Sequence, residues 1–133
     1  MKALVADTHS AIWYVADSPE LSSAAVTAMD DATDAGKPIY VSAITLIEMT
    51  YLIEKGRLPE RDLTDLLNEL KNPLSNFELV AIDLAVTQSL RLISRADVPD
   101  MPDRIIAATA RHLNLPLVTR DHKIRAAKLL TIW

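Results

Sequence analysis

Short apolar runs alternate with longer amphipathic stretches along the whole sequence, and this alternation constrains the fold most. Apolar and β-branched runs are typical of buried strands, whereas apolar residues three and four positions apart are typical of helices. Strands are predicted for Lys2–Ala6, Ile39–Val41, Phe77–Ile82, Leu115–Thr119 and Leu130–Trp133. Helices are predicted for Thr8–Ala16, Ser22–Ala35, Ser42–Glu54, Pro59–Lys71, Asp83–Ile93, Pro102–Leu113 and Asp121–Leu129. Strands separated by helices indicate an α/β fold with helices on both faces of a mainly parallel central sheet.

Length and composition limit the class of protein further. A chain of 133 residues, of which 50% are apolar or aromatic, is long enough for one domain, which we expect to span residues 1–133. The absence of cysteine excludes disulfides and thiolate zinc sites. Two glycines are too few for a glycine-rich phosphate loop, which disfavours Walker-type and dinucleotide-binding sites. The apolar run Ala3–Ala6 is too short to span a membrane, so we expect a soluble, cytoplasmic protein with no membrane partner.

The net charge of −4 argues against a protein that binds nucleic acid mainly through a cationic surface. It does not exclude a nucleic-acid enzyme, because a bound metal ion can supply positive charge locally.

Four acidic residues stand at unusual places: Asp7 after an apolar run, Glu48 within one, Asp103 in a first helical turn, and Asp121 after a strand. The carboxyl ends of parallel strands gather at one edge of a sheet, so Asp7 and Asp121 should lie on the same edge. The loop that precedes Asp103 can bring this residue to the same place. Several carboxylates in one cleft repel one another unless they share a cation. Ligands that offer only oxygen favour a hard ion, Mg²⁺ or Mn²⁺.

Each acid also has an ordinary structural explanation. Asp7 and Asp121 suit helix N-caps, and Asp103 suits the positive end of a helix dipole. Glu48 is harder to explain in this way, because no Lys or Arg stands within four residues of it, although Arg104 could pair with it from a distance. The three histidines have no spacing typical of a zinc site, and exposed positions without an essential role are expected for His9 and His122.

Four motifs together resemble the PIN domain, and more closely the VapC-type toxin ribonucleases of bacterial toxin-antitoxin pairs. They are Asp7-Thr8 after the first strand, Ser42-Ala43-Ile44 leading to Glu48, Asp100 to Ala110, and Leu117 to Asp121. By this resemblance, Asp7, Glu48, Asp103 and Asp121 are the catalytic residues and ligands of Mg²⁺ or Mn²⁺. Thr119 and Asp100 would support the site.

The resemblance implies metal-dependent hydrolysis of RNA. It also implies a homodimer and a cognate antitoxin protein whose C-terminal segment covers the acidic site, often with an inserted arginine. Arg120 and Lys123 lie close enough in sequence to the acids to bind substrate phosphate, whereas Arg125 and Lys128 suit a solvated helix face. Recognition of unpaired RNA generally also uses stacking on aromatic side chains, which are scarce here at 5% of residues.

Two other functions stay open at this point. An inactive PIN-like module could bind RNA or protein without cleavage. A phosphoacceptor domain needs an aspartate after a middle strand and a nearby lysine; Asp83 follows a strand, but no lysine follows the Leu115–Thr119 strand until Lys123. An apolar groove formed by Trp13, Tyr14, Met49, Tyr51 and Leu52 is a further possibility, although core packing is the commoner fate of such residues.

Overall fold

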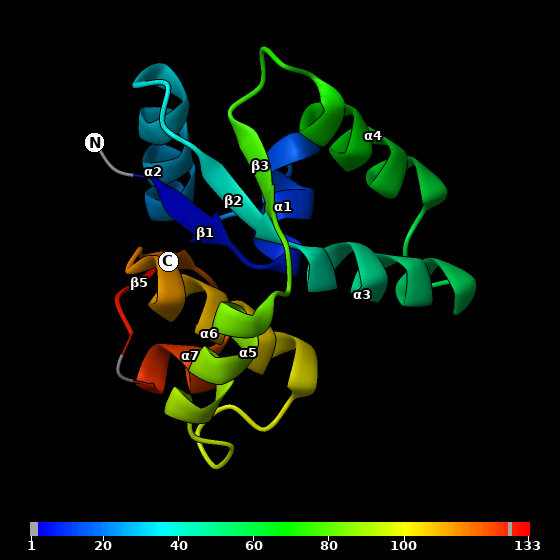
Figure 1. The fold of residues 1–133 in the computed structure, drawn as a ribbon. Coiled ribbons are helices and arrows are strands. Elements are labelled where there is room, and N and C mark those ends of the chain that lie inside the picture. The colour runs from blue at the N-terminus through cyan, green and yellow to red at the C-terminus, as the bar shows by residue number, and fades with distance from the viewer. Residues whose placement is uncertain (1–2, 128) are drawn as a thin grey trace.

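Five strands form one parallel sheet in the computed structural model, which describes residues 3–127 and 129–133. The strands lie side by side in the order β3-β2-β1-β4-β5 (Figure 1). Their bounds are β1 Leu4–Ala6, β2 Ile39–Ser42, β3 Phe77–Val80, β4 Leu117–Val118 and β5 Thr131–Ile132. The parallel sheet predicted from the alternating pattern is confirmed.

Helices cover both faces of this sheet. Their bounds are α1 Thr8–Val15, α2 Ser23–Asp34, α3 Ala43–Glu54, α4 Glu60–Lys71, α5 Leu84–Ser89, α6 Met101–Leu113 and α7 His122–Ala126, with a 3₁₀ turn at Leu90–Leu92. Helices α1, α2 and α4 pack on one face, and α5, α6 and α7 pack on the other (Figure 1). Helix α3 reaches both, because Met49 joins the first core and Ile44 the second. The three-layer α/β/α architecture is therefore confirmed.

The strand β1 shows why the sheet sequences are apolar throughout. Leu4 and Ala6 are buried in one core, and Val5, between them, is buried in the other. Successive side chains of a strand point to opposite faces, so a strand covered on both sides must be apolar at every position. Burial of a side chain the size of Leu4 or Val5 contributes about 1.5–3 kcal/mol.

Several elements are shorter than the sequence indicates, and the local backbone structure explains two of them. The Leu115 amide donates to the carbonyl of Ala110 at 3.0 Å and so belongs to the end of α6, which leaves only Leu117–Val118 in β4. Helix α7 ends because Ala127 takes an extended conformation, with ψ of 161°. Lys2 and Lys128, which the sequence places in a strand and in a helix, lie outside the described residues.

The strand order creates a crevice at the centre of the sheet. From β1 the chain adds β2 and β3 on one side, and later adds β4 and β5 on the other side. The loops that leave the carboxyl ends of β1 and β4 therefore run in opposite directions, and ligands of open α/β sheets bind at such a point. Asp7 follows β1 directly and Asp121 follows β4 closely, so both lie beside this crevice.

No helix within residues 3–127 and 129–133 is both long enough and apolar enough to cross a membrane.

Candidate metal centre

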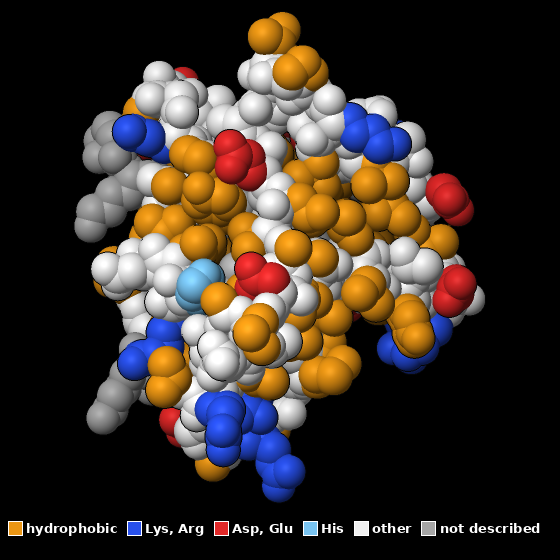
Figure 2. Space-filling model, viewed as in Figure 1, with side chains coloured by type: hydrophobic (Ala, Val, Ile, Leu, Met, Phe, Trp, Pro, Cys, Tyr) orange, Lys and Arg blue, Asp and Glu red, His pale blue; other side chains and the backbone are white. Residues whose placement is uncertain are grey.

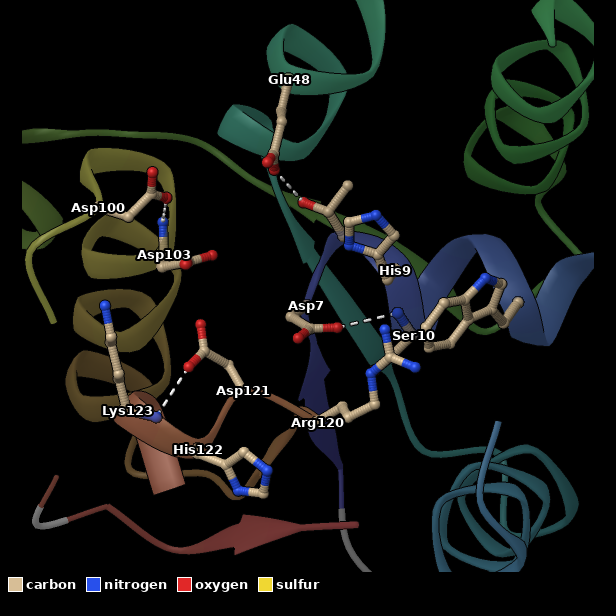
Figure 3. A pocket seen from close by; sticks show the side chains of 12 residues that line it. Asp7, His9, Ser10, Glu48, Asp100, Asp103, Arg120, Asp121, His122 and Lys123 are labelled. Atoms are coloured by element: carbon tan, nitrogen blue, oxygen red, sulfur yellow. Dashed lines mark hydrogen bonds between the residues drawn. The ribbon is translucent and has the colours of Figure 1, made fainter. Parts of the chain in front are cut away.

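An open pocket of ≈ 600 Å³ brings all four candidate acids together (Figure 3). Its lining comprises Asp7, Thr8, His9, Ser10, Trp13, Glu48, Asp100, Asp103, Arg120, Asp121, His122 and Lys123. Asp7, Glu48, Asp103 and Asp121 come from four separate parts of the chain. The sequence placed Asp7 and Asp121 on one edge of the sheet and allowed Asp103 to join them, and the structure adds Glu48 to the same pocket.

Asp7 is both the N-cap of α1 and part of the pocket wall. Its Oδ1 accepts a hydrogen bond from the Ser10 amide at 2.9 Å, and its own amide donates to the carbonyl of Val118 at 3.1 Å. The hydroxyl of Ser10 also donates to Val118, at 3.2 Å. These bonds join the start of α1 to the end of β4, so the position of Asp7 relative to Asp121 is set by backbone structure.

Glu48 is held by a hydroxyl. Thr8, which is buried, donates from Oγ1 to Oε1 of Glu48 at 2.6 Å, and the Thr8 hydroxyl lies 3.0 Å from that of Thr45. Arg104 makes no ion pair with Glu48: its Nε donates to the carbonyl of Ile93 at 2.9 Å. The idea that Arg104 neutralises Glu48 is therefore wrong. Glu48 is half-buried, and among residues 3–127 and 129–133 no cation lies close enough to pair with it.

Asp103 lies in the first turn of α6, and Asp100 caps the same helix by accepting from the Asp103 amide at 3.2 Å. Burial, together with the negative charges of Asp100, Asp121 and Glu48, raises the pKa of Asp103 to about 8. The pocket thus holds more negative charge than its surroundings can stabilise, so one carboxyl keeps a proton unless a cation enters.

Asp121 is positioned by the turn that leaves β4. Its amide donates to Oγ1 of Thr119 at 3.1 Å, and its Oδ1 accepts from the Lys123 amide at 2.8 Å as the N-cap of α7. Thr119 is fully buried. It acts on Asp121 through the backbone, and it does not line the cavity.

The chemistry of the donors fits a hard divalent cation. The pocket offers carboxylate oxygens, which Mg²⁺ and Mn²⁺ prefer, and Mg²⁺ usually keeps several waters beside one or two protein ligands. As they stand, no three Asp, Glu or His side chains in the described part of the chain form a complete metal-binding group. A loosely spaced acidic pocket in which Asp103 holds a proton suits a cation that is bound partly through water.

Sequence reasoning missed three residues of the pocket that have clear contacts. Thr8 orients Glu48, Ser10 ties α1 to β4, and Trp13 lies beneath the guanidinium of Arg120, whose Cζ is 4.7 Å from the ring centroid. The Asp7-Thr8 motif could have predicted a role for Thr8, because Thr8 directly follows a predicted metal ligand at the start of the same helix. His9 and His122 are exposed, as expected, and both line the pocket.

Comparison with known proteins agrees with this fold. The PIN domain family model matches residues 4–129. The chain is 28% identical over 136 residues to Ribonuclease VapC22 of Mycobacterium tuberculosis (strain ATCC 25618 / H37Rv), with 100% of each chain covered.

Two of the similar solved structures are complexes with DNA. VapBC2 from Rickettsia felis bound to a DNA fragment from its promoter gives a TM-score of 0.71 at 18% identity, covering 97% of this chain and 96% of that one. DNA-bound VapBC from Salmonella typhimurium gives 0.68 at 21% identity, with 98% and 96% covered.

Fold and site together define an α/β protein with an acidic pocket at the central crevice of a parallel sheet. Because the family model matches nearly the whole chain, the chain belongs to the PIN domain family.

The raised pKa of Asp103 predicts how metal-free stability depends on pH. The unfolded chain releases this proton near pH 3.8, whereas the folded protein keeps it to about pH 8. The wild type should therefore lose free energy of unfolding as the pH rises through this interval, and Asp103→Asn should not, because Asn does not ionise. The advantage of Asp103→Asn over wild type should grow from pH 4 to pH 8 in urea denaturation with EDTA.

Asp83→Asn is the matched control, since Asp83 caps α5 by accepting from the Val86 amide at 3.0 Å and does not line the pocket. Saturating Mn²⁺ should reduce the difference between wild type and Asp103→Asn at pH 8. If the free energy of unfolding depended on pH in the same way for both proteins in EDTA, the raised pKa assigned to Asp103 would be contradicted.

Proposed function

We propose that residues 1–133 form a single PIN-like nuclease domain, a Mg²⁺- or Mn²⁺-dependent endoribonuclease that hydrolyses RNA phosphodiester bonds. The observation that carries this proposal is the convergence of Asp7, Glu48, Asp103 and Asp121 in one open pocket at the central crevice of the sheet. Membership of the PIN domain family and the similarity to a protein named a ribonuclease both support it.

Each acid has a role that follows from its position. A divalent cation held in the pocket supplies Lewis acidity and a water of lowered pKa. Asp7 and Asp103, from the starts of α1 and α6, hold the principal ion. Glu48 and Asp121 either complete a second cation site or orient the attacking water by hydrogen bonding.

Two cations at the rim suit the substrate backbone. Arg120 and Lys123 are exposed and line the pocket beside Asp121. An RNA strand brings a negative charge at every phosphate, and a net negative protein needs local cations to receive it. Arg120 and Lys123 therefore hold the phosphates next to the scissile bond, while Asp100 and Thr119 support the acids from outside the reacting centre.

The biological role that we propose is that of the toxin in a toxin-antitoxin pair in the cytoplasm. Two of the similar solved structures are VapBC complexes. A cognate antitoxin would cover the acidic pocket with its C-terminal segment. A cationic side chain from that segment would satisfy the same carboxylates that otherwise bind the metal ion.

Homodimer formation is a further part of the proposal. Apolar side chains gather over β3, α3 and α5 on the face seen in Figure 2. Large exposed apolar residues of these elements are Ile47, Tyr51, Leu79 and Leu84. Clustered exposed apolar surface of this kind is typical of protein interfaces.

Asp7→Asn should abolish RNA cleavage, with a loss of about 100-fold or more in rate, because one charged ligand is removed from the principal cation. Asn is as good an N-cap as Asp, so the fold should be retained. The measurement is cleavage of a labelled single-stranded RNA in Mg²⁺ or Mn²⁺, with calorimetric titration of Mn²⁺ as a second reading.

Asp83→Asn provides the control for that experiment, because it makes the same change at the N-cap of α5 outside the pocket. Full cleavage by Asp7→Asn would defeat the enzyme assignment. Absence of cleavage and of Mn²⁺ binding in the wild type would favour the alternative function, an inactive module that binds RNA or protein.

Co-expression with the product of the neighbouring gene should relieve growth inhibition by this chain and give a stable complex on gel filtration. The expected reason is coverage of the acidic pocket. Asp7→Asn should be harmless when expressed alone and should still form the complex. A wild-type chain that neither inhibits growth nor binds that product would remove the toxin role while leaving the nuclease assignment intact.

Leu84→Glu should convert the dimer to a monomer in light-scattering measurements, because the side chain is 73% exposed on the apolar face and a buried charge there is costly. The matched control is Leu130→Glu, at a side chain 64% exposed just before β5, on the opposite edge of the sheet from β3. A wild-type protein that is monomeric at all concentrations would contradict this part of the proposal.

A further inference from the structure

Trp13 stands at the centre of a group of planar side chains beside the acids. The ring centroid of Trp13 lies 5.4 Å from that of His9 and 6.1 Å from that of Trp133, and Cζ of Arg120 lies 4.7 Å from it. These residues come from α1, from the loop between β4 and α7, and from the end of the chain. Trp13, His9 and Arg120 also line the acidic pocket.

Core packing accounts for only part of this arrangement. Trp13 is partly buried and packs against the core on the α1 face of the sheet, as many helix tryptophans do. Core packing alone does not explain why the exposed guanidinium of Arg120 lies on the ring of Trp13. Arg120 is adjacent to Asp121 and shares a pocket with four acids, yet it makes no ion pair among the described residues and lies over Trp13 instead.

The combination matches what unpaired RNA needs. Bases that are not paired stack on aromatic rings and on arginine planes, and this stacking tolerates any base. Within the described lining of the pocket, Trp13 is the single aromatic residue apart from histidines. A base can therefore find a large stacking surface at this one wall, while its phosphate lies near the acids.

We propose that Trp13, together with Arg120, is the stacking platform for one unpaired base next to the scissile phosphate. This inference rests on the proposed ribonuclease function and adds its substrate class, a single-stranded or looped RNA. One unpaired base of that RNA would stack with its flat face on Trp13 and Arg120. Trp13 is then a specificity-determining residue: it selects unpaired over paired RNA, without a strong preference for one base.

The test compares two strands of equal charge that differ only in their bases. A labelled oligouridine of about eight nucleotides and an abasic ribose-phosphate strand of the same length are titrated with protein carrying Asp7→Asn, which prevents cleavage. Fluorescence anisotropy gives both dissociation constants. The oligouridine should bind about tenfold more tightly than the abasic strand, since stacking of one base corresponds to about that factor.

Variants of the platform should remove this preference. Trp13→Leu should weaken oligouridine binding about tenfold and leave binding of the abasic strand unchanged. Trp13→Tyr keeps an aromatic ring and should therefore retain most of the affinity for oligouridine. Arg120→Lys keeps the charge but loses the plane, so it should reduce the preference for oligouridine over the abasic strand. The exposed Arg120 can be changed without disturbing the core, so it tests the inference even if Trp13→Leu unfolds in circular dichroism. Arg111→Lys is the matched control, because it makes the same change at an exposed arginine that does not line the pocket.

The outcomes separate this inference from the function on which it rests. Equal binding of the two strands, with RNA cleavage intact in the wild-type protein, would overturn the stacking platform but not the ribonuclease function. An unchanged oligouridine affinity in Trp13→Leu, accompanied by loss of the antitoxin complex, would also overturn it and assign this wall to a protein partner. Failure of the wild type to bind or cut RNA at all would overturn both.

Discussion

Mutual repulsion among carboxylates at one edge of the sheet is the constraint on which this structure depends. Two like charges about 4 Å apart repel by about 4 kcal/mol at an intermediate dielectric. The acids of this pocket share that problem: burial, and after it the charges of Asp100, Asp121 and Glu48, raise the pKa of Asp103 to about 8. An arrangement of this kind persists only because the surrounding fold holds the acids in place and offsets part of their repulsion.

Helix N-termini supply much of that offset. Asp7, Asp100 and Asp121 are the N-caps of α1, α6 and α7, and Asp103 lies in the first turn of α6. In a parallel sheet with crossover helices, the positive ends of the helix dipoles meet at the carboxyl edge of the strands. Capping and metal binding are therefore not competing explanations of these acids. The same amide groups that anchor the carboxylates also make their accumulation tolerable.

Glu48 follows a different rule, and this explains how far the sequence alone could reach. The alternation of apolar runs and amphipathic stretches was enough to predict the sheet and the layers, because strands buried on both faces leave an unbroken apolar signature. It also placed Asp7 and Asp121 on one edge. Glu48 stood out only by the absence of a nearby cation, and the hydroxyl of Thr8 that orients it is 40 residues away in the chain. Contacts of this kind depend on how α1 and α3 meet, which no local pattern encodes.

Helix α1 carries most of the proposed chemistry, and its geometry suggests how one nucleotide would lie. Asp7 stands at its N-cap and Trp13 within its second turn, so that the rise of about 1.5 Å per residue separates them by about 9 Å along the helix axis. Between them, Thr8 orients Glu48, and Ser10 fixes the helix start to β4. In the proposed complex, a phosphate at the N-terminus of α1 would lie beside the acids, and its base would extend along α1 toward Trp13. The residues proposed for cleavage and for base stacking, Asp7 and Trp13, are then positioned by one helix. A shift of α1 relative to β4 would displace both residues together.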